Sequence, residues 1–400
     1  MAQPEKSTAT NHLVSGSDAP ELKEVRVGFI PLTDCASVAI ASLMKFDEKY
    51  GIKIIPCKQP SWAAVRDKVV SGELHAAQAL YGLVYGVHLG IGGLKKDMAV
   101  LMTINNNGQG ISLARQLEDR GVTDGPSLAK LIKSRDRDYT FAHTFPTGTH
   151  AMWLYYWLAS YGIDPITDIK TITVPPAQMV MNARLGSMDG FCVGEPWNAR
   201  GIYDKVSFSV ASSQDIWPDH PEKVLGATAE FVDQHPNTAR ALVMAMLDAA
   251  KYIDTQANRA KVAELIAGPD YVDAPVEVIA GRFLGNYEDG LGKTWYDPNH
   301  MKFFNDGKVP FPWLSDGMWF LTQFKRWGLL KEDPDYLAVA KQINRIELYR
   351  QAAAQLSVAM PEEVMRSSRL MDGALLNGKG WDGKDPRGYA DSFDMQTLQA

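Results

Sequence analysis

The sequence has 400 residues, of which 46% are hydrophobic and 22% charged, with a formal net charge of −6 at pH 7. This composition is that of a globular chain with about two or three domains or one large two-lobed domain, and it excludes disordered, collagen-like and coiled-coil proteins. The acidic balance also excludes a surface that is cationic all over, as nucleic-acid binding requires. Positive charge for an anionic ligand therefore has to be local.

Cysteines and apolar runs limit the class of protein further. Cys35, Cys57 and Cys192 are widely spaced and odd in number, which favours neither a disulfide framework nor a metal site and is typical of a reducing compartment. No run of 18 apolar residues is present, so we expect no insertion into a membrane. The polar residues 1–23 read as a flexible tail without the features of a secretory signal, which predicts a cytoplasmic protein.

Apolar, β-rich segments alternate with helical patterns from residue 25 to about residue 230. Strands are expected over 25–32, 52–57, 98–104, 139–143, 169–174 and 190–193, and helices over 37–50, 62–71, 127–134, 149–161 and 176–185. The first strand, helix and strand fit within about 35 residues, the size of a βαβ unit, which predicts parallel strands.

Beyond residue 231 the pattern becomes helical. Helices are expected over 237–255, 259–267, 275–284, 315–327 and 334–355, with no further strand of similar quality, and the Gly-, Asp- and Pro-rich stretch 378–393 is expected to be irregular. An α/β region followed by a helical part is typical of two-lobed binding proteins, in which a small ligand lies at the carboxyl ends of the strands.

A turn-rich segment leads into the helix expected at 149–161. Thr147 or Thr149 is a candidate N-cap, and the free N–H groups of a first helical turn bind small oxyanions. His150 lies in that turn, where its ring could donate to the same anion. The alternative is an ordinary cap beside a surface histidine.

Five further residues are candidates for binding. Gly194 allows close backbone approach to a ligand, and Glu195 is a general base, a metal ligand or a buried carboxylate that accepts from backbone N–H groups. Lys223 is a buried counter-ion or a solvated lysine. Trp62 stacks on a flat ligand or packs in the core, and Gln109 is an amide donor or a loop residue.

Enzyme motifs are absent from the sequence. It contains no HExxH, no GxxxxGK[ST] and no GxSxG, its histidines are scattered, and no pair of carboxylates stands out. We therefore expect a protein that is not an enzyme, with no catalytic residue, no bound metal and no cofactor.

Four segments occur in order and resemble one protein family. They are VGFIPLTDCAS, GTHAMWLYYWLASYGIDP, VPPAQMVMNARLGSMDGFCVGEPWN and HPEKVLGA. The chain, from about Val25 to Leu348, resembles the nitrate- and bicarbonate-binding proteins of ABC transporters, of the NrtA/CmpA type. The resemblance implies a two-lobed type II periplasmic-binding-protein fold with a helical C-terminal part. After the tail 1–23, lobe I is expected over 24–108 and 230–400, and lobe II over 109–229.

The resemblance also implies a set of ligand-binding residues. It implies that Trp62, Gln109, His150 and Lys223 contact the anion, that Pro176, Val193 and Gly194 form the neighbouring wall, and that Leu32 and Thr33 line the opposite lobe. The bicarbonate-binding relatives are expected to carry a carboxylate with calcium at the lysine position, so Lys223 favours nitrate or nitrite.

The absence of a leader in the sequence points to the cytoplasmic sensor branch of this family, the NasS type. Such a protein is expected to hold an RNA-binding antiterminator (NasT type, with an ANTAR domain) inactive, without touching nucleic acid itself. Nitrate or nitrite then releases the antiterminator and permits transcription of nitrate assimilation genes. The alternative is the extracytoplasmic nitrate- or nitrite-binding subunit of an ABC importer.

Overall fold

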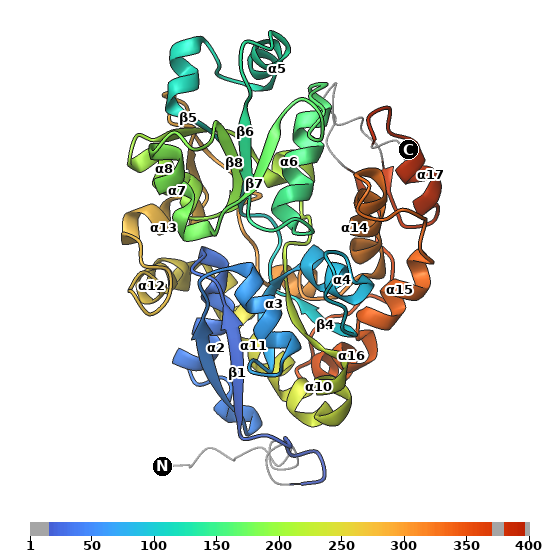
Figure 1. The fold of residues 1–400 in the computed structure, drawn as a ribbon. Helices are drawn as coiled ribbons and strands as arrows, with labels where there is room; N and C mark the ends of the chain where they lie inside the picture. The colour runs from blue at the N-terminus through green and yellow to red at the C-terminus, as the bar shows by residue number, and fades with distance from the viewer. Residues whose placement is uncertain (1–15, 370–379, 397–400) are drawn as a thin grey trace.

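The computed structural model describes residues 16–369 and 380–396, which form two lobes, each built on its own five-stranded sheet (Figure 1). The first sheet has the order β2 (Lys53–Lys58), β1 (Glu24–Phe29), β3 (Ala76–Leu80), β10 (Lys223–Thr228) and β4 (Met98–Thr103). The second has the order β7 (Lys170–Thr173), β6 (Thr140–His143), β8 (Gly190–Gly194), β5 (Gln109–Ala114) and β9 (Ser207–Ser212).

The parallel pairing predicted from the spacing of the first elements is confirmed for β1 and β2, but each sheet as a whole is mixed. In the first sheet β10 runs antiparallel to β3 and β4, and in the second β5 runs antiparallel to β8 and β9. The other pairs, such as β1 with β2 and β6 with β7, are parallel. The antiparallel strand of each sheet, β10 or β5, directly follows a segment in which the chain crosses from one lobe to the other. The crossing reverses the direction of the chain.

The chain crosses between the lobes at two adjoining segments. The first crossing connects β4 to β5, and the second connects α9 (Ser213–Ile216) to β10. Backbone hydrogen bonds join the two crossings: Ile104 N donates to Lys223 O at 2.7 Å and Glu222 N donates to Asn105 O at 3.1 Å. The crossings therefore form a short two-stranded hinge, and the residues just beyond them face both lobes.

Helices cover both sheets. Those up to the second crossing are α2 (Ala36–Leu43), α3 (Trp62–Val70), α4 (Tyr81–Leu89), α5 (Gly125–Lys133), α6 (Thr149–Ser160), α7 (Met179–Arg184), α8 (Trp197–Tyr203) and α9. Those after it are α10 (Ala229–Gln234), α11 (Pro236–Asp254), α12 (Gln256–Ile266), α13 (Val276–Phe283), α14 (Leu314–Arg326), α15 (Tyr336–Ile343), α16 (Ile346–Gln355) and α17 (Pro386–Asp391). Short 3₁₀ turns are η1 (Thr33–Cys35), η2 (Glu48–Tyr50), η3 (Arg115–Arg120), η4 (Pro176–Gln178) and η5 (Asn305–Gly307), and two-stranded ribbons are β11 (Asn286–Glu288) with β12 (Thr294–Tyr296) and β13 (Ser368–Arg369) with β14 (Gly380–Trp381).

The predicted α/β class is confirmed, but two sequence expectations need correction. The helix expected at 334–355 is two helices, because the Asn344 amide is held by the Tyr81 and Tyr85 hydroxyls of α4 and the backbone leaves helical geometry at Arg345. The irregular stretch 378–393 contains α17, whose N-cap Asp385 accepts from Gly388 N, while its residues 378–379 lie outside the described part. No helix among the described residues is long and apolar enough to cross a lipid bilayer.

The boundaries expected for the lobes, 24–108, 109–229 and 230–400, do not match the structure everywhere. The segment 223–228 is β10 of the first sheet rather than part of lobe II. After α12, the chain crosses again: α13 packs on α8, and Arg115 Nη2 of the second lobe donates to Gly290 O. It returns where Asn106 and Lys302 form a backbone bridge. The C-terminal part therefore belongs to both lobes.

The back of the lobe boundary is filled by α14. Its Phe320 ring stacks at 5.3 Å on Tyr81 from α4 of the first lobe, and its Trp319 ring lies 4.9 Å from that of Trp153 on α6 of the second. Trp217 joins the same group, 5.3 Å from Trp319. We call Tyr81, Trp153, Trp217, Trp319 and Phe320 the aromatic wall. It belongs to one of the two apolar cores, and the other lies between the first sheet and helices α2 and α11.

Candidate functional site: a buried charge cluster between the lobes

The candidate site lies beside the two crossings. Gln109 is the first residue of β5, directly after the first crossing, and Lys223 is the first residue of β10, directly after the second. Asp34 enters from η1, beyond the carboxyl end of β1, and His150 enters from the first turn of α6. The topology therefore brings together four side chains that are up to 189 positions apart in the sequence.

The Lys223 side chain lies at the centre of the site and is fully buried. Its Nζ donates to Asp34 Oδ2 at 2.8 Å and to Glu222 Oε1 at 3.0 Å. Burial alone lowers the pKa of a lysine, but the charges and hydrogen bonds of Asp34 and Glu222 raise the pKa of Lys223 above its ordinary value. Lys223 is thus a buried ammonium ion, and the solvated alternative is wrong.

Two carboxylates, which the sequence analysis did not single out, surround this ammonium. Asp34 also accepts from the Gln78 amide, and Glu222 accepts from the Thr149 hydroxyl and, through Oε2, from Trp153 Nε1 at 3.0 Å. Burial raises the pKa of Asp34 although the charge of Lys223 acts in the opposite direction. With both carboxylates and Lys223 ionised, the cluster carries a net charge of −1.

A chain of hydrogen bonds connects α6 to the cluster. His150 Nε2 lies 2.6 Å from Gln109 Oε1, and His150 Nδ1 lies 2.6 Å from Thr144 Oγ1. Because an amide oxygen only accepts, this network assigns the proton of the neutral ring to Nε2. Burial, with the charges of Lys223 and two other histidines, holds the pKa of His150 well below its ordinary value. The fully buried His150 is therefore neutral and not a surface histidine.

Two buried donors of this region have no hydrogen-bond partner within the described residues. They are the indole Nε1 of Trp62 and the hydroxyl of Thr33. Trp62 begins α3 and its ring centre lies 5.7 Å from Lys223 Nζ, while Thr33 directly precedes Asp34. Buried donors are normally paired, so these two identify the neighbourhood of Lys223 as a place where a hydrogen-bond acceptor belongs.

Glycines allow the walls to approach closely. A Cβ on Gly194 would lie 2.6 Å from Gln109 Oε1 of its own lobe and 3.0 Å from Leu32 Cδ2 of the first lobe, so a side chain there would press on both. Gly194 pairs with Gln109 across β8 and β5, and Val193 pairs with Gly110. Pro176 is buried at the start of η4, but no hydrogen bond or ring contact connects it with the Lys223 cluster.

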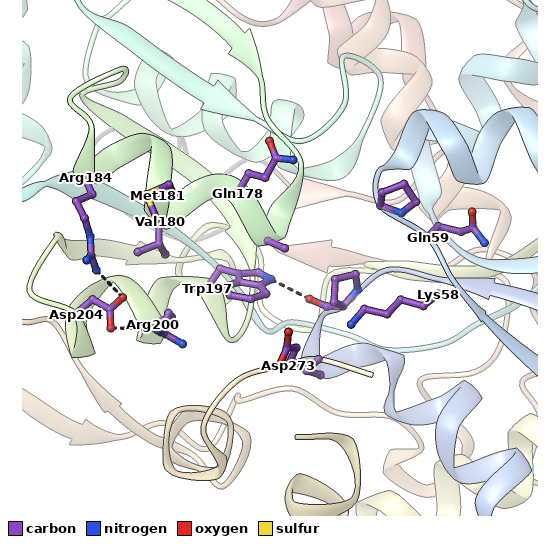
Figure 2. Close-up of a pocket in the computed structure, with 14 residues that line it drawn as sticks. Lys58, Gln59, Gln178, Val180, Met181, Arg184, Trp197, Arg200, Asp204 and Asp273 are labelled. Carbon is purple, nitrogen blue, oxygen red and sulfur yellow. Dashed lines mark hydrogen bonds and ion pairs between the residues drawn. The ribbon is translucent and has the colours of Figure 1, made fainter. Parts of the chain in front are cut away.

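Two direct hydrogen bonds close the front of the lobe boundary. Thr33 N donates to Glu195 O at 2.7 Å, and Trp197 Nε1 donates to Pro31 O at 2.9 Å. Outside them lies a cavity of about 720 Å³, which Figure 2 shows between Lys58 and Gln59 of the first lobe and α7 and α8 of the second. Its lining includes Arg184 and Arg200, which both pair with Asp204.

Some local predictions for the site were wrong in detail. The N-cap of α6 is Gly148 rather than Thr147 or Thr149, since the backbone is extended at 148 and helical from 149. A glycine fits there because a Cβ at 148 would come within 2.6 Å of Leu80 Cδ1. The Thr149 hydroxyl instead donates a hydrogen bond to Glu222. Glu195 is the predicted buried carboxylate that accepts from a backbone N–H, that of Ala199 at 3.2 Å, but it also forms an ion pair with Arg282 at 2.6 Å.

Sequence reasoning missed Asp34 and Glu222, although a signal for each was present. Asp34 interrupts an apolar run in FIPLTDCASVAI, and Glu222 directly precedes Lys223 in HPEKV. A carboxylate inside an apolar segment is buried only when it is paired, so both positions required a cation nearby. In the described part of the chain, no group of three or more His, Cys, Asp or Glu side chains is arranged to hold a metal ion.

The sequence matches a known family model. Residues 18–267 match the model of the NMT1-like family, which is more than half of the chain. The chain belongs to the NMT1-like family. Within it, the chain is 36% identical to the nitrate/nitrite binding protein NrtA of Synechocystis sp., over 98% of this chain and 90% of that protein. It is 29% identical to the bicarbonate-binding protein CmpA of Synechococcus elongatus, over 96% of this chain and 89% of that protein.

A solved structure supports the same placement of this NMT1-like protein. The crystal structure of the periplasmic nitrate-binding protein NrtA from Synechocystis matches with a TM-score of 0.89 and 35% identity, over 94% of this chain and all of that one. The chain is therefore an NrtA-like member of its family with the periplasmic-binding-protein fold, as the motifs indicated. The NrtA and CmpA relatives are named as binding proteins and not as enzymes.

Proposed function

We propose that this protein binds nitrate or nitrite in the cluster around Lys223. The observation that carries the proposal is the fully buried ammonium of Lys223 between the lobes, beside the Trp62 indole. Lys223 Nζ, Trp62 Nε1, the Gln109 amide and the Thr33 hydroxyl are donors from both lobes, and a small anion accepts from several donors at once. Nitrate is planar, so one of its faces suits the flat wall of an indole ring.

Lys223 also distinguishes between the anions bound by the named relatives. A lysine supplies the positive charge itself, whereas a carboxylate at this position would need a cation such as calcium. The names of the NrtA relatives, at up to 36% identity over nearly the whole chain, support nitrate and nitrite ahead of bicarbonate.

Thermal unfolding in the presence of nitrate, nitrite, sulfate, and bicarbonate with calcium tests the ligand. A ligand that binds only the folded state stabilises it by about 2.7 kcal/mol at 100-fold excess over its Kd. We expect a shift with nitrate or nitrite, its loss in Lys223→Met, and its retention in the matched variant Lys170→Met, whose lysine lies at the surface. A shift only with bicarbonate and calcium would contradict the proposal.

We further propose that the protein serves as the substrate-binding subunit of an ABC importer. The support is the structural likeness to a protein named as a periplasmic nitrate-binding protein. Nitrate-dependent stimulation of the ATPase of a reconstituted transporter tests this role. The cytoplasmic sensor that sequesters an ANTAR-domain antiterminator stays a prediction. Capture of such a protein, released by nitrate, would favour the sensor over the importer.

A further inference from the structure

The charges around Lys223 leave no surplus positive charge for an anion. One ammonium already serves two carboxylates, Asp34 and Glu222, and all three groups are fully buried. His150 is neutral, and the next two nearby histidines, His143 and His220, have pKa values lowered to about 4 and about 3, chiefly by burial. A bare nitrate ion would bring the net charge of the cluster to −2.

A buried site with two uncompensated negative charges is strongly unfavourable, because each loses the solvation that water gave it. Nitrate cannot remove the difficulty by taking up a proton, since nitric acid is a strong acid. The compensating positive charge must therefore be added to the protein side of the site, and the groups present there that accept protons are carboxylates and imidazoles.

We propose that the anion binds together with one proton, which Asp34 carries in the complex. The inference rests on the proposed function and deepens it. The proton comes from the solvent and forms an O–H bond at Asp34 Oδ2. The Lys223 ammonium then turns its hydrogen bond from that oxygen to the anion, and the new hydroxyl of Asp34 becomes a further donor. The cluster keeps its net charge of −1.

We assign the proton to Asp34 rather than to Glu222 because the hydrogen bonds that Asp34 keeps without Lys223 are weaker. Without Lys223, Glu222 keeps the Thr149 hydroxyl and the Trp153 indole as donors from α6. Asp34 keeps the Gln78 amide and a Gln109 amide at 3.5 Å, the outer limit of a hydrogen bond. Donors stabilise the ionised form of a carboxylate, so Asp34 is protonated first when the ammonium turns away.

The other groups that face Asp34 do not supply the proton. From its own turn comes the Cys35 thiol, whose pKa is raised by burial. From β10 and its preceding residue come Lys223 and Glu222, and from β3 and β5 come the amides of Gln78 and Gln109. Helix α2, which packs on η1, contains no charged residue, and the one buried charge on α12, Arg259, is held by Asp254 and by the carbonyls of Phe283 and Met301.

Proton uptake makes the affinity depend on pH. Between the pKa of Asp34 in the free protein and its higher pKa in the complex, Kd rises about tenfold for each unit of pH. The affinity is therefore higher at low pH and falls as the pH rises. A site in which a carboxylate must be ionised for binding would show the opposite pH dependence, with an affinity that rises as the pH rises.

Isothermal titration calorimetry with nitrate, in phosphate and in Tris buffer, measures the protons taken up, because the two buffers have different heats of ionisation. For the unmodified protein we expect uptake of about one proton per nitrate and a Kd that rises with pH. Asp34→Asn should bind nitrate with uptake near zero and a flat pH profile. Asp316→Asn is the matched control, since it makes the same change at a buried carboxylate that pairs with Arg366 outside the Lys223 cluster, and it should still take up a proton.

The outcomes separate the two proposals. Nitrate binding by the unmodified protein without proton uptake and with a flat Kd overturns this inference and leaves the proposed function intact, whether or not the variants fold. Uptake that persists in Asp34→Asn, or that disappears equally in Asp316→Asn, overturns the assignment to Asp34. If nitrate causes no heat and no thermal shift at any pH, the proposed function itself fails.

Discussion

The boundary between the lobes is built differently at its front and its back. At the front, the backbone bond from Thr33 to Glu195 and the indole bond from Trp197 to Pro31 join the lobes beside a cavity of about 720 Å³. At the back, α14 presses the aromatic wall into the boundary, with ring centroids 4.9 to 5.3 Å apart along Trp153, Trp319 and Trp217.

This difference indicates where the molecule opens. A hydrogen bond that water can replace contributes about 1 kcal/mol net, whereas each buried aromatic ring contributes several times as much. We therefore expect the lobes to separate at the front and to stay joined at the back. The Lys223 cluster lies between these two regions, and the bond from Trp153 to Glu222 connects it to the back.

The largest effect is expected from removing a ring of the aromatic wall. Trp319→Ala should lower the free energy of unfolding by about 4 kcal/mol, because it leaves a large cavity where both lobes meet. Denaturant unfolding measures the loss. Trp295→Ala makes the same change at a partly exposed indole on β12 and should cost less than half as much. Equal losses in the two variants would mean that the back of the boundary is no stronger than a surface ribbon.

A histidine at the back gives the boundary a pH dependence. The His220 ring lies 4.6 Å from the Trp153 ring, and burial lowers its pKa to about 3. The folded protein therefore binds fewer protons than the unfolded chain below about pH 6.5, so stability present at pH 7 is lost as the pH falls. We expect a loss of about 2 kcal/mol between pH 7 and pH 5 from this group.

Unfolding curves at several pH values test this contribution. His220→Asn should make the decline in stability between pH 7 and pH 5 shallower by about 2 kcal/mol, while the other buried histidines, His143 and His150, keep their share of it. An unchanged slope in His220→Asn would assign the acid sensitivity to other groups.

At the front, a single methyl group should hold the lobes apart. Gly194→Ala places a Cβ against Gln109 Oε1 and Leu32 Cδ2, and overpacking of this kind costs about 2 kcal/mol. The contact with Gln109 lies within the second lobe and exists in any arrangement, whereas the contact with Leu32 exists only when the lobes are together. We therefore expect nitrate affinity to fall by up to about 30-fold, together with some loss of unfolding free energy. A loss of stability without a loss of affinity would show that the front does not open.

The smallest effect is expected from the indole bond at the front. Trp197→Phe keeps the ring and removes the hydrogen bond to Pro31, which is worth about 1 kcal/mol, so nitrate affinity should fall about fivefold. Titration calorimetry measures it. The same replacement at Trp327, whose Nε1 has no partner within the described residues, should leave the affinity unchanged. A similar loss of nitrate affinity in both variants would show that the bond from Trp197 to Pro31 does not help to hold the lobes together.

The sequence predicted the site unevenly. Motifs placed Trp62, Gln109, His150, Gly194 and Lys223 in one anion site, and the structure brings these five residues together around the two crossings. Pro176 was expected with them, and the structure places it, buried, at the start of η4. These motifs are local, and the resemblance to a family supplied the long-range proximity that local patterns lack.

The parts that sequence reasoning missed depend on distant partners. Strands β5, β9 and β10 were not expected, because QGISLA and KVLGAT contain glycine and polar residues where a strand pattern needs continuous apolar or alternating positions. They are strands because their neighbours in each sheet provide the hydrogen bonds. Asp34 was missed for the same reason, since its cation lies 189 residues away in the sequence.

The repeated passage of the chain between the lobes has a mechanical consequence. Besides the two adjoining crossings, the chain passes to the second lobe after α12 and returns before Lys302. In between, Arg282 on α13 forms an ion pair with Glu195, whose carbonyl oxygen accepts from Thr33 N of the first lobe. Two tethers at one hinge would leave the lobes free to twist against each other, and the additional tethers remove that freedom. We therefore expect the lobes to bend about a single axis, so that one distance, measured between labels on the two lobes at the front, would report the whole motion.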